Sequence, residues 1–190
     1  MEGYNVRLLR EPGGTAIGEE VRHTLIHSAG NVSMTAETEL LLMIASRAQL
    51  VREIIRPSLA TGEIVVCDRF YDSTIAYQGY GRQLDLAIVR AVTEFAVGGT
   101  HPDVTILLDV SLPVSESRRA RRDQSGKRLP DRLENSGRSF FERVSTGFKA
   151  IAGTQEARLR VIDGEQPLEV IRDKIWHLVI HAMRPSQPKV

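Results

Sequence analysis

Short apolar runs rich in β-branched residues and bounded by polar or turn residues predict four buried β-strands. They cover residues 5–9, 63–68, 103–110 and 158–163. Apolar positions spaced three or four apart predict helices over residues 17–26, 36–55, 84–97, 140–151 and 168–183. Strands and helices therefore alternate, which is typical of an α/β fold with a parallel sheet covered on both faces.

The clearest helical pattern begins at Ala36. Its apolar positions form one broad face, namely Leu40, Leu41, Met43, Ile44, Ala48, Val51, Ile54 and Ile55. Pro57 is expected to end this helix because proline has no backbone N–H to donate. The apolar surface exceeds what one sheet face usually covers, so a homodimer formed through this helix is expected.

Length and composition narrow the class of protein. The 190 residues, 42% of them hydrophobic, predict one domain over residues 1–183, followed by a frayed tail at 184–190. The net charge of +1 argues against binding of nucleic acid or an anionic membrane by the chain as a whole. The single cysteine, Cys67, and the lack of an apolar stretch of roughly 20 residues or a signal peptide predict a cytoplasmic protein.

The residues that follow the first two strands carry candidate chemistry, because ligands of parallel sheets bind at the carboxyl ends of the strands. The first strand precedes Arg10-Glu11-Pro12-Gly13-Gly14-Thr15 and a helix start. A carboxylate beside a flexible backbone and a helix N-terminus can hold a phosphate or its magnesium shell. The alternative is a glycine-rich turn with a helix cap.

The second strand ends in Asp68-Arg69-Phe70-Tyr71, and residues 73–82 follow with hydroxyl, aromatic, amide and glycine groups. These groups suit a small planar polar ligand that carries a phosphate, although an Asp–Arg pair at a strand end is often a solvated ion pair. Arg47, in the middle of the most apolar helix, either addresses a base carbonyl or is a snorkelling or dimer-edge arginine.

Residues 118–132 form a basic cluster of seven cations against two acids: Arg118, Arg119, Arg121, Arg122, Lys127, Arg128 and Arg132, with Asp123 and Asp131. The cluster suits a flap that neutralises charge on a transferring phosphoryl group. A solvated helix face is the simpler alternative. Nucleic-acid binding is less favoured because no aromatic residue interleaves with the cations.

The chain resembles bacterial thymidylate kinase over about residues 3–180, on the strength of three stretches taken together. They are Arg10-Glu-Pro-Gly-Gly-Thr, Asp68-Arg-Phe with Ser73-Thr-x-Ala-Tyr-Gln-Gly, and the basic stretch that ends in Pro130-Asp-Arg-Leu-Glu134. The resemblance implies a P-loop NTPase-like three-layer fold. It also implies transfer of the ATP γ-phosphate to dTMP with Mg²⁺, and a lid at about residues 117–134.

The resemblance also implies residue roles. Glu11 would help to place the acceptor phosphate and its Mg²⁺, Asp68 would lie near the metal, and Arg69 would grip that phosphate. Arg47 would read the thymine carbonyl, Ser73 and Gln78 would face the base, and Tyr77 would pack by the deoxyribose. Arg121, Arg122, Lys127 and Arg128 would belong to the lid. The substrate-binding set is completed by Pro12, Met43 and Phe70.

Two departures from the family pattern change these expectations. Met43 and Ile44 occupy the positions where the family usually has a phenylalanine that stacks on thymine, so base binding is expected to weaken by about 1 kcal/mol. The chain also has no Gly-x-x-x-x-Gly-Lys-[Ser/Thr] phosphate loop, and Met1 falls at the end of the family's first helix. These residues alone are therefore expected to be inactive, and an upstream segment of about 30 residues is expected.

The missing segment includes the central strand of the family's sheet, between the strands predicted at 63–68 and 103–110. Unpaired inner edges predict a poorly soluble or molten chain when it is expressed alone. Three alternatives remain open: a non-catalytic nucleotide-binding or interaction protein, a kinase for another nucleoside monophosphate, and a decayed gene fragment.

Overall fold

A computed structural model describes residues 3–124, 132–133 and 136–183. They form two compact units. Unit 1 comprises Met1–His101 and Pro130–Phe148, and unit 2 comprises Pro102–Leu129 and Lys149–Val190. The predicted lid at 117–134 crosses this division, and the predicted single domain stays a prediction.

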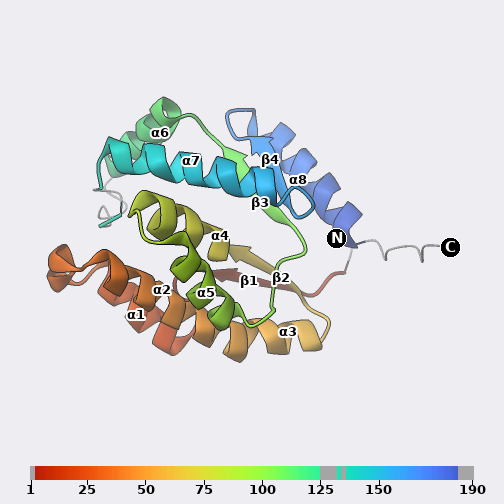
Figure 1. The fold of residues 1–190 in the computed structure, drawn as a ribbon. Coiled ribbons are helices and arrows are strands. Elements are labelled where there is room, and N and C mark those ends of the chain that lie inside the picture. Colours follow the sequence, from red (N-terminus) through yellow and green to blue (C-terminus); the bar gives the residue numbers. More distant parts are fainter. Residues whose placement is uncertain (1–2, 125–131, 134–135, 184–190) are drawn as a thin grey trace. The chain divides into compact units, whose positions relative to one another are not determined.

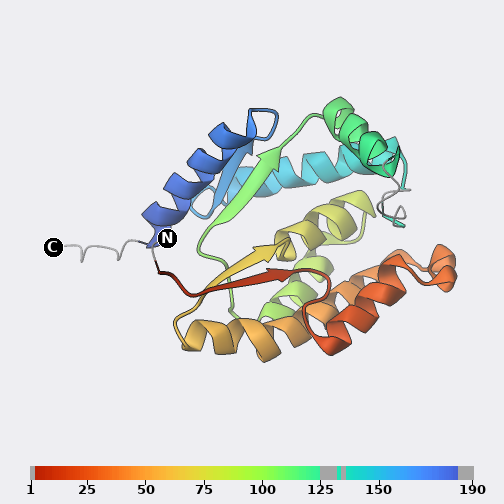
Figure 2. The ribbon, with the colours of Figure 1, turned by 180° about the vertical axis from the view of Figure 1, so that it is seen from behind.

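Unit 1 contains two parallel strands, β1 (Val6–Arg10) and β2 (Ile64–Asp68), paired in register from Val6 opposite Ile64 to Arg10 opposite Asp68. They run side by side in Figure 2. The Glu11 N–H donates to the Asp68 carbonyl at 3.0 Å, one step beyond the ladder. The carboxyl ends of both strands, and the motifs that follow them, are thus adjacent.

The helical elements of unit 1 follow the loops of this sheet, as labelled in Figure 1. They are α1 (Ala16–Ile26), the 3₁₀ turn η1 (Ala29–Ser33), α2 (Ala36–Leu50), the π-helical η2 (Val51–Ile55), α3 (Arg56–Ala60), α4 (Tyr71–Thr74), the π-helical η3 (Ile75–Gly81) and α5 (Leu86–Val97). Polar side chains cap several starts: Thr15 accepts from Gly18 N–H, and Asp85 accepts from Ala87 N–H.

The prediction that Pro57 ends the long helix is wrong. The chain continues through η2 into α3, which ends at Ala60, and Pro57 lies in the first turn of α3. The wider π-helical turn from Val51 to Ile55 precedes it, with the Arg56 N–H bonded to the Val51 carbonyl. A proline is tolerated at a helix start because the N–H it lacks needs no partner there.

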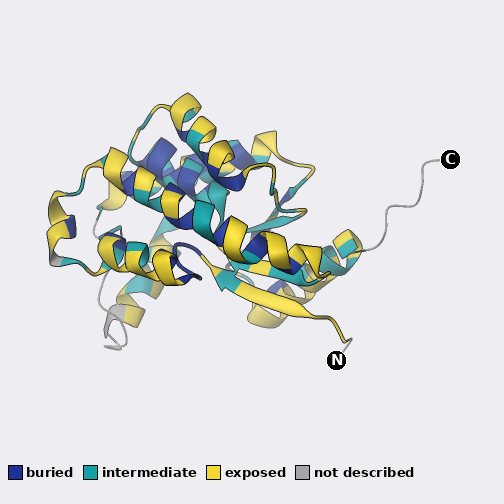
Figure 3. Ribbon diagram, turned by 90° about the horizontal axis from the view of Figure 1, so that it is seen from below, coloured by how far each residue is buried: buried dark blue, intermediate teal, exposed yellow. Residues whose placement is uncertain are grey.

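The core of unit 1 lies on two sides of the long helix. Leu50, Val51 and Ile55 pack beneath the sheet against Leu9 and Val65. Leu40 and Ile44, farther toward the start of α2, pack against Val89 and Ala96 of α5. Figure 3 shows the resulting alternation of buried and exposed positions along the helices.

Unit 2 contains the parallel strands β3 (Thr105–Asp109) and β4 (Leu159–Asp163), with α6 (Leu112–Gln124) and α8 (Leu168–Met183). The helix α7 (Arg138–Thr154) begins in unit 1 and ends in unit 2. Arg118 of α6 donates to the Gly164 carbonyl at 3.1 Å, and Glu165 accepts from the Ser111 N–H at 2.8 Å. These bonds fix the start of α6 beside the loop after β4.

The predicted α/β class with parallel strands is confirmed, and each predicted strand lies within two residues of the observed bounds. Helix α6 was not among the predicted helices. In the described part of the chain the strands form two separate ladders, β1 with β2 and β3 with β4. The predicted loop at 125–130 and the tail at 184–190 lie outside the described residues. Every described helix is too short or too polar to cross a bilayer.

Candidate active site

The loop after β1 is closed by hydrogen bonds to two helices. Gly13 N–H donates to Ser46 Oγ of α2 at 3.1 Å, and Gly14 N–H donates to Glu19 Oε1 of α1 at 2.8 Å. Arg10 holds the same Glu19 carboxylate through two 3.0 Å bonds. Gly14 has φ of 87°, a left-handed conformation that a side chain would strain. The loop is therefore a fixed support for Glu11.

Glu11 and Arg47 form a buried ion pair. Arg47 Nη2 lies 2.6 Å from Glu11 Oε2, and Arg47 Nε lies 2.9 Å from Oε2 and 3.2 Å from Oε1. The two side chains are 4% and 3% exposed. Arg47 Nη1 is buried and has no hydrogen-bond partner among the described residues. An unpaired buried N–H group costs free energy, so this atom is available to donate to a ligand that supplies an acceptor.

Burial raises the pKa of the Glu11 carboxyl, and the charge and hydrogen bonds of Arg47 only partly offset this effect. Both carboxylate oxygens are engaged by Arg47, so Glu11 acts first as the group that orients the guanidinium. The ring of Phe70 lies 5.6 Å from the Arg47 guanidinium carbon and forms a second side of its surroundings. Burial also raises the pKa of the Cys67 thiol to about 12, so this residue stays a neutral thiol.

The end of β2 presents exposed charges. Asp68 and Arg69 are both exposed, and Arg69 has φ of 65°, which is uncommon for a residue with a side chain. Residues held in such conformations cluster at functional sites. The Arg69 guanidinium carbon lies 5.2 Å from the centre of the Tyr77 ring. A cation and a carboxylate thus stand at the carboxyl ends of the two strands.

The helical segment after β2 supplies the remaining predicted residues. Ser73 is half-buried, and its N–H donates to the Phe70 carbonyl at 3.0 Å. Tyr77 is half-buried, with its ring 5.9 Å from that of Phe140. Gln78 is buried, and its Nε2 donates to Glu39 Oε1 at 2.8 Å. Pro12, at the other strand end, is buried and accepts from Arg22 at 2.9 Å.

One stripe of α2 carries three of the residues around this region. Glu39, Met43 and Arg47 are four residues apart, and side chains at this spacing share a helix face. Met43 is half-buried between the two buried charges. Glu39 was not among the residues predicted from the sequence, although a carboxylate eight residues before Arg47, inside an apolar helix pattern, was a signal for it.

The remaining predicted residues belong to the other unit or lie outside the described residues. Arg121 and Arg122 are exposed on α6 of unit 2, and Lys127 and Arg128 lie outside the described residues. No group of three or more metal-binding side chains occurs in the described ranges. Asp68 is the predicted metal-site carboxylate that is exposed, and one or two carboxylates with water and phosphate oxygens are what Mg²⁺ usually requires.

Comparisons with known proteins place the chain beside one family. A model of the family "Thymidylate kinase" matches residues 1–175. The thymidylate kinase of Desulforudis audaxviator is 46% identical over 176 residues, which are 93% of this chain and 76% of that protein. The thymidylate kinase of Alcanivorax borkumensis is 44% identical over 179 residues, 94% of this chain and 83% of that protein. The crystal structure of thymidylate kinase from Ehrlichia chaffeensis matches with a TM-score of 0.71 at 34% identity, covering 93% and 80% of the two chains.

Proposed function

We propose how the site works from the premise that the chain belongs to the thymidylate kinase family. The function of this family is nucleoside monophosphate phosphorylation, in which ATP is the phosphate donor and dTMP the acceptor. The P-loop NTPase-like fold class follows from the parallel α/β arrangement and the solved relative.

Arg47 is proposed to read a carbonyl of the thymine base. The observation that carries this proposal is its buried Nη1, which has no partner among the described residues while Nε and Nη2 are held by Glu11. A donor fixed in this way suits a carbonyl oxygen, because the geometry is set before the ligand binds. Met43, Phe70, Ser73, Tyr77, Pro12 and Gln78 are proposed to form the rest of the nucleoside site.

Arg69 is proposed to grip the acceptor phosphate. Its exposed guanidinium and left-handed backbone at the end of β2 support this role, because arginine binds phosphate oxygens in a bidentate manner. Asp68 is proposed to hold Mg²⁺ through its water shell beside that phosphate. Glu11 is proposed to act indirectly, because its carboxylate holds Arg47 in place. Bound Mg²⁺ would neutralise charge on the phosphates during transfer.

The lid assignment is carried over as a proposal. Arg121, Arg122, Lys127 and Arg128 are proposed to neutralise charge on the transferring phosphoryl group, which positively charged clamps do in phosphoryl transfer. The sequence supports this by placing seven cations within residues 118–132. The expectation that residues 1–190 alone do not transfer the phosphoryl group stays a prediction.

We also propose a cytoplasmic homodimer. Large apolar side chains on α2 and α5 support the dimer: Leu41 is 59% exposed, and Ile88 and Phe95, seven residues apart on α5, are 59% and 76% exposed. Ile88 and Phe95 share one face of α5, and exposed apolar side chains that gather on one face are typical of an interaction surface. The single cysteine is compatible with a reducing compartment.

Titration calorimetry with dTMP, dCMP and dUMP tests the acceptor assignment. We expect the chain to bind dTMP, and to bind dCMP more weakly because its 4-amino group offers the Arg47 donor no acceptor. Arg47→Lys should weaken dTMP binding by about 10- to 100-fold, the size of a lost hydrogen bond from a charged donor. Arg7→Lys is the matched control, because Arg7 holds Glu63 through the same kind of fork at the surface. A folded chain that binds no dTMP overturns the proposal.

A further inference from the structure

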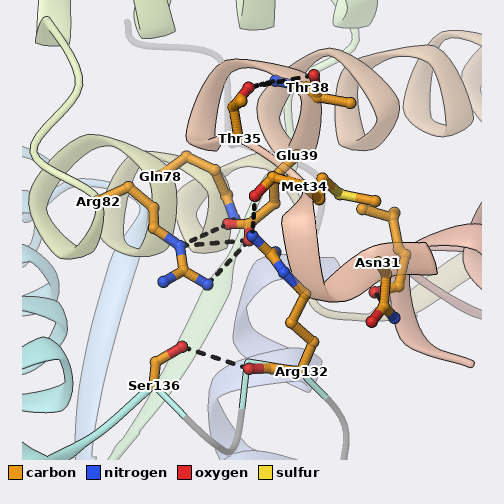
Figure 4. A network of polar contacts seen from close by, with 10 residues as sticks. Asn31, Met34, Thr35, Thr38, Glu39, Gln78, Arg82, Arg132 and Ser136 are labelled. Atoms are coloured by element: carbon orange, nitrogen blue, oxygen red, sulfur yellow. Dashed lines mark hydrogen bonds and ion pairs between the residues drawn. The ribbon is translucent and has the colours of Figure 1, made fainter. Parts of the chain in front are cut away.

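A second buried carboxylate, that of Glu39, collects an unusual set of donors (Figure 4). Its side chain is 1% exposed. Arg82 donates to it from Nε at 3.1 and 3.2 Å and from Nη2 at 2.9 Å, and Arg132 donates from Nη1. Gln78 adds an amide N–H at 2.8 Å. One acid thus serves two cations and one neutral amide.

The Gln78 contact fixes which way its amide points. Burial raises the pKa of the Glu39 carboxyl, but the hydrogen bonds from Arg82 and Gln78 and the charges of Arg82 and Arg132 outweigh it and hold the pKa below its ordinary value. An ionised carboxylate only accepts hydrogen bonds, so Gln78 must turn its NH₂ group toward Glu39. Its Oε1 then faces away from Glu39.

The position of Glu39 connects this contact with the base site. Glu39 and Arg47 lie two helical turns apart on one stripe of α2, a rise of about 12 Å, with Met43 between them. Gln78 follows Tyr77 directly, and Tyr77 contacts Arg69. The Glu39 carboxylate is therefore hydrogen-bonded to the segment that is proposed to hold the nucleoside.

We propose that Glu39 is a positioning residue that fixes Gln78 with its carbonyl oxygen toward the base and thereby selects bases with an N–H donor at position 3. This inference rests on the proposed function, because it assumes that Gln78 faces the acceptor base. Thymine and uracil carry a donor at that position, whereas cytosine carries an acceptor. A base with an acceptor there leaves Gln78 Oε1 facing a lone pair, which costs binding.

A purely structural role for Glu39 makes a different forecast. Two arginines satisfy the charge of Glu39 without any amide, so in a purely structural role the orientation of Gln78 has no effect on which base binds. In Glu39→Gln, Arg82 and Arg132 still require an acceptor and draw the new carbonyl oxygen toward themselves. The new NH₂ group then faces Gln78, whose amide must flip and present its own NH₂ to the base. The variant should therefore change which base is preferred, as well as any loss of stability.

The experiment measures the ratio of the dissociation constants for dCMP and dTMP by calorimetry, in wild type, in Glu39→Gln and in the control Glu142→Gln. Glu142 pairs with Arg138 at an exposed position of α7, so this control makes the same chemical change at the surface. We expect the ratio to fall at least about tenfold in Glu39→Gln, and to stay unchanged in the control. An unchanged ratio with dTMP binding retained overturns the role of Glu39 and leaves the proposed function standing.

Measurements on wild type cover two further cases, a variant that does not fold and a wild type that does not bind dTMP. If Glu39→Gln does not fold, the side-chain NH₂ protons of Gln78 are followed by NMR exchange with and without dTMP. We expect them to stay protected in both states because they remain on Glu39, and free exchange in the dTMP complex overturns the inference. Absence of dTMP binding by folded wild type removes the proposed function and this inference together.

Discussion

The buried pair between Glu11 and Arg47 should couple strongly in a double-mutant cycle. The pair has three N–O contacts between 2.6 and 3.2 Å, and its side chains are 4% and 3% exposed. Arg47→Met alone leaves a buried carboxylate without a counter-charge, and removing one partner of such a pair costs about 3–5 kcal/mol. Glu11→Gln in turn leaves a guanidinium facing an amide. The double variant removes both charges, so its loss should be smaller than the sum of the single losses by about 3 kcal/mol.

Urea unfolding at neutral pH, followed by circular dichroism with midpoints and slopes compared across the four proteins, measures this coupling. The matched control is the pair Arg7 and Glu63, which has two contacts of 3.0 and 3.1 Å but lies at the surface, with the Arg7 side chain 51% exposed. The cycle of Arg7→Met and Glu63→Gln should show no measurable coupling, because solvent screens exposed pairs. A coupling at Glu11 and Arg47 no larger than in the control would refute the reasoning.

Three further results are expected. Met43→Phe should tighten dTMP binding about fivefold by adding an aromatic face one turn before Arg47, and unchanged calorimetry would count against a base contact at Met43. The free energy of unfolding of wild type should exceed that of Glu39→Gln by its full amount above pH 4.5, the ordinary pKa of a glutamate carboxyl, and the difference should disappear as pH falls through the lowered pKa of Glu39. A difference that does not change with pH in urea titrations contradicts this. Phe95→Glu should convert a dimer to a monomer in sedimentation velocity, whereas Val32→Glu, at another exposed apolar position, should not. An unaltered sedimentation coefficient for both variants excludes the α5 surface as the dimer interface.

Much of the fold could be predicted from the sequence because its signals are local. The strands at 64–68 and 105–109 are short apolar runs between polar residues, and their bounds depend mainly on that pattern. The expectation that the residues after the first two strands carry the site agrees with the adjacency of Glu11 and Asp68, since parallel strands bring their carboxyl ends to one edge. The continuation of the helix past Pro57 did not follow, because the π-helical turn that precedes it has no local sequence signature.

The site was predicted as a set of residues but not as a set of contacts. Arg47 stood out because it is a charge in an apolar helix, yet its partner Glu11 lies 36 positions away and is found only by the folded chain. Glu39 and Gln78 are likewise 39 positions apart. Long-range pairings of this kind depend on how α2 packs against the loops after β1 and β2. The sequence pattern shows which residues are unusual, whereas packing decides which of them meet.

Stability alone does not account for two buried charges on one stripe of α2. A whole buried ion pair can often be replaced by apolar residues without loss of stability, because removing two charges from water costs about as much as their attraction returns. Stability of the fold therefore does not require charged residues at positions 39 and 47. Each instead leaves one oriented polar atom: the unpartnered Nη1 of Arg47, and the Oε1 of Gln78 that the Glu39 contact turns outward. On the proposed assignment, this donor and this acceptor complement the carbonyl oxygen and the adjacent N–H of thymine. The two charges are then explained by selection of the base, since an apolar stripe would supply neither atom.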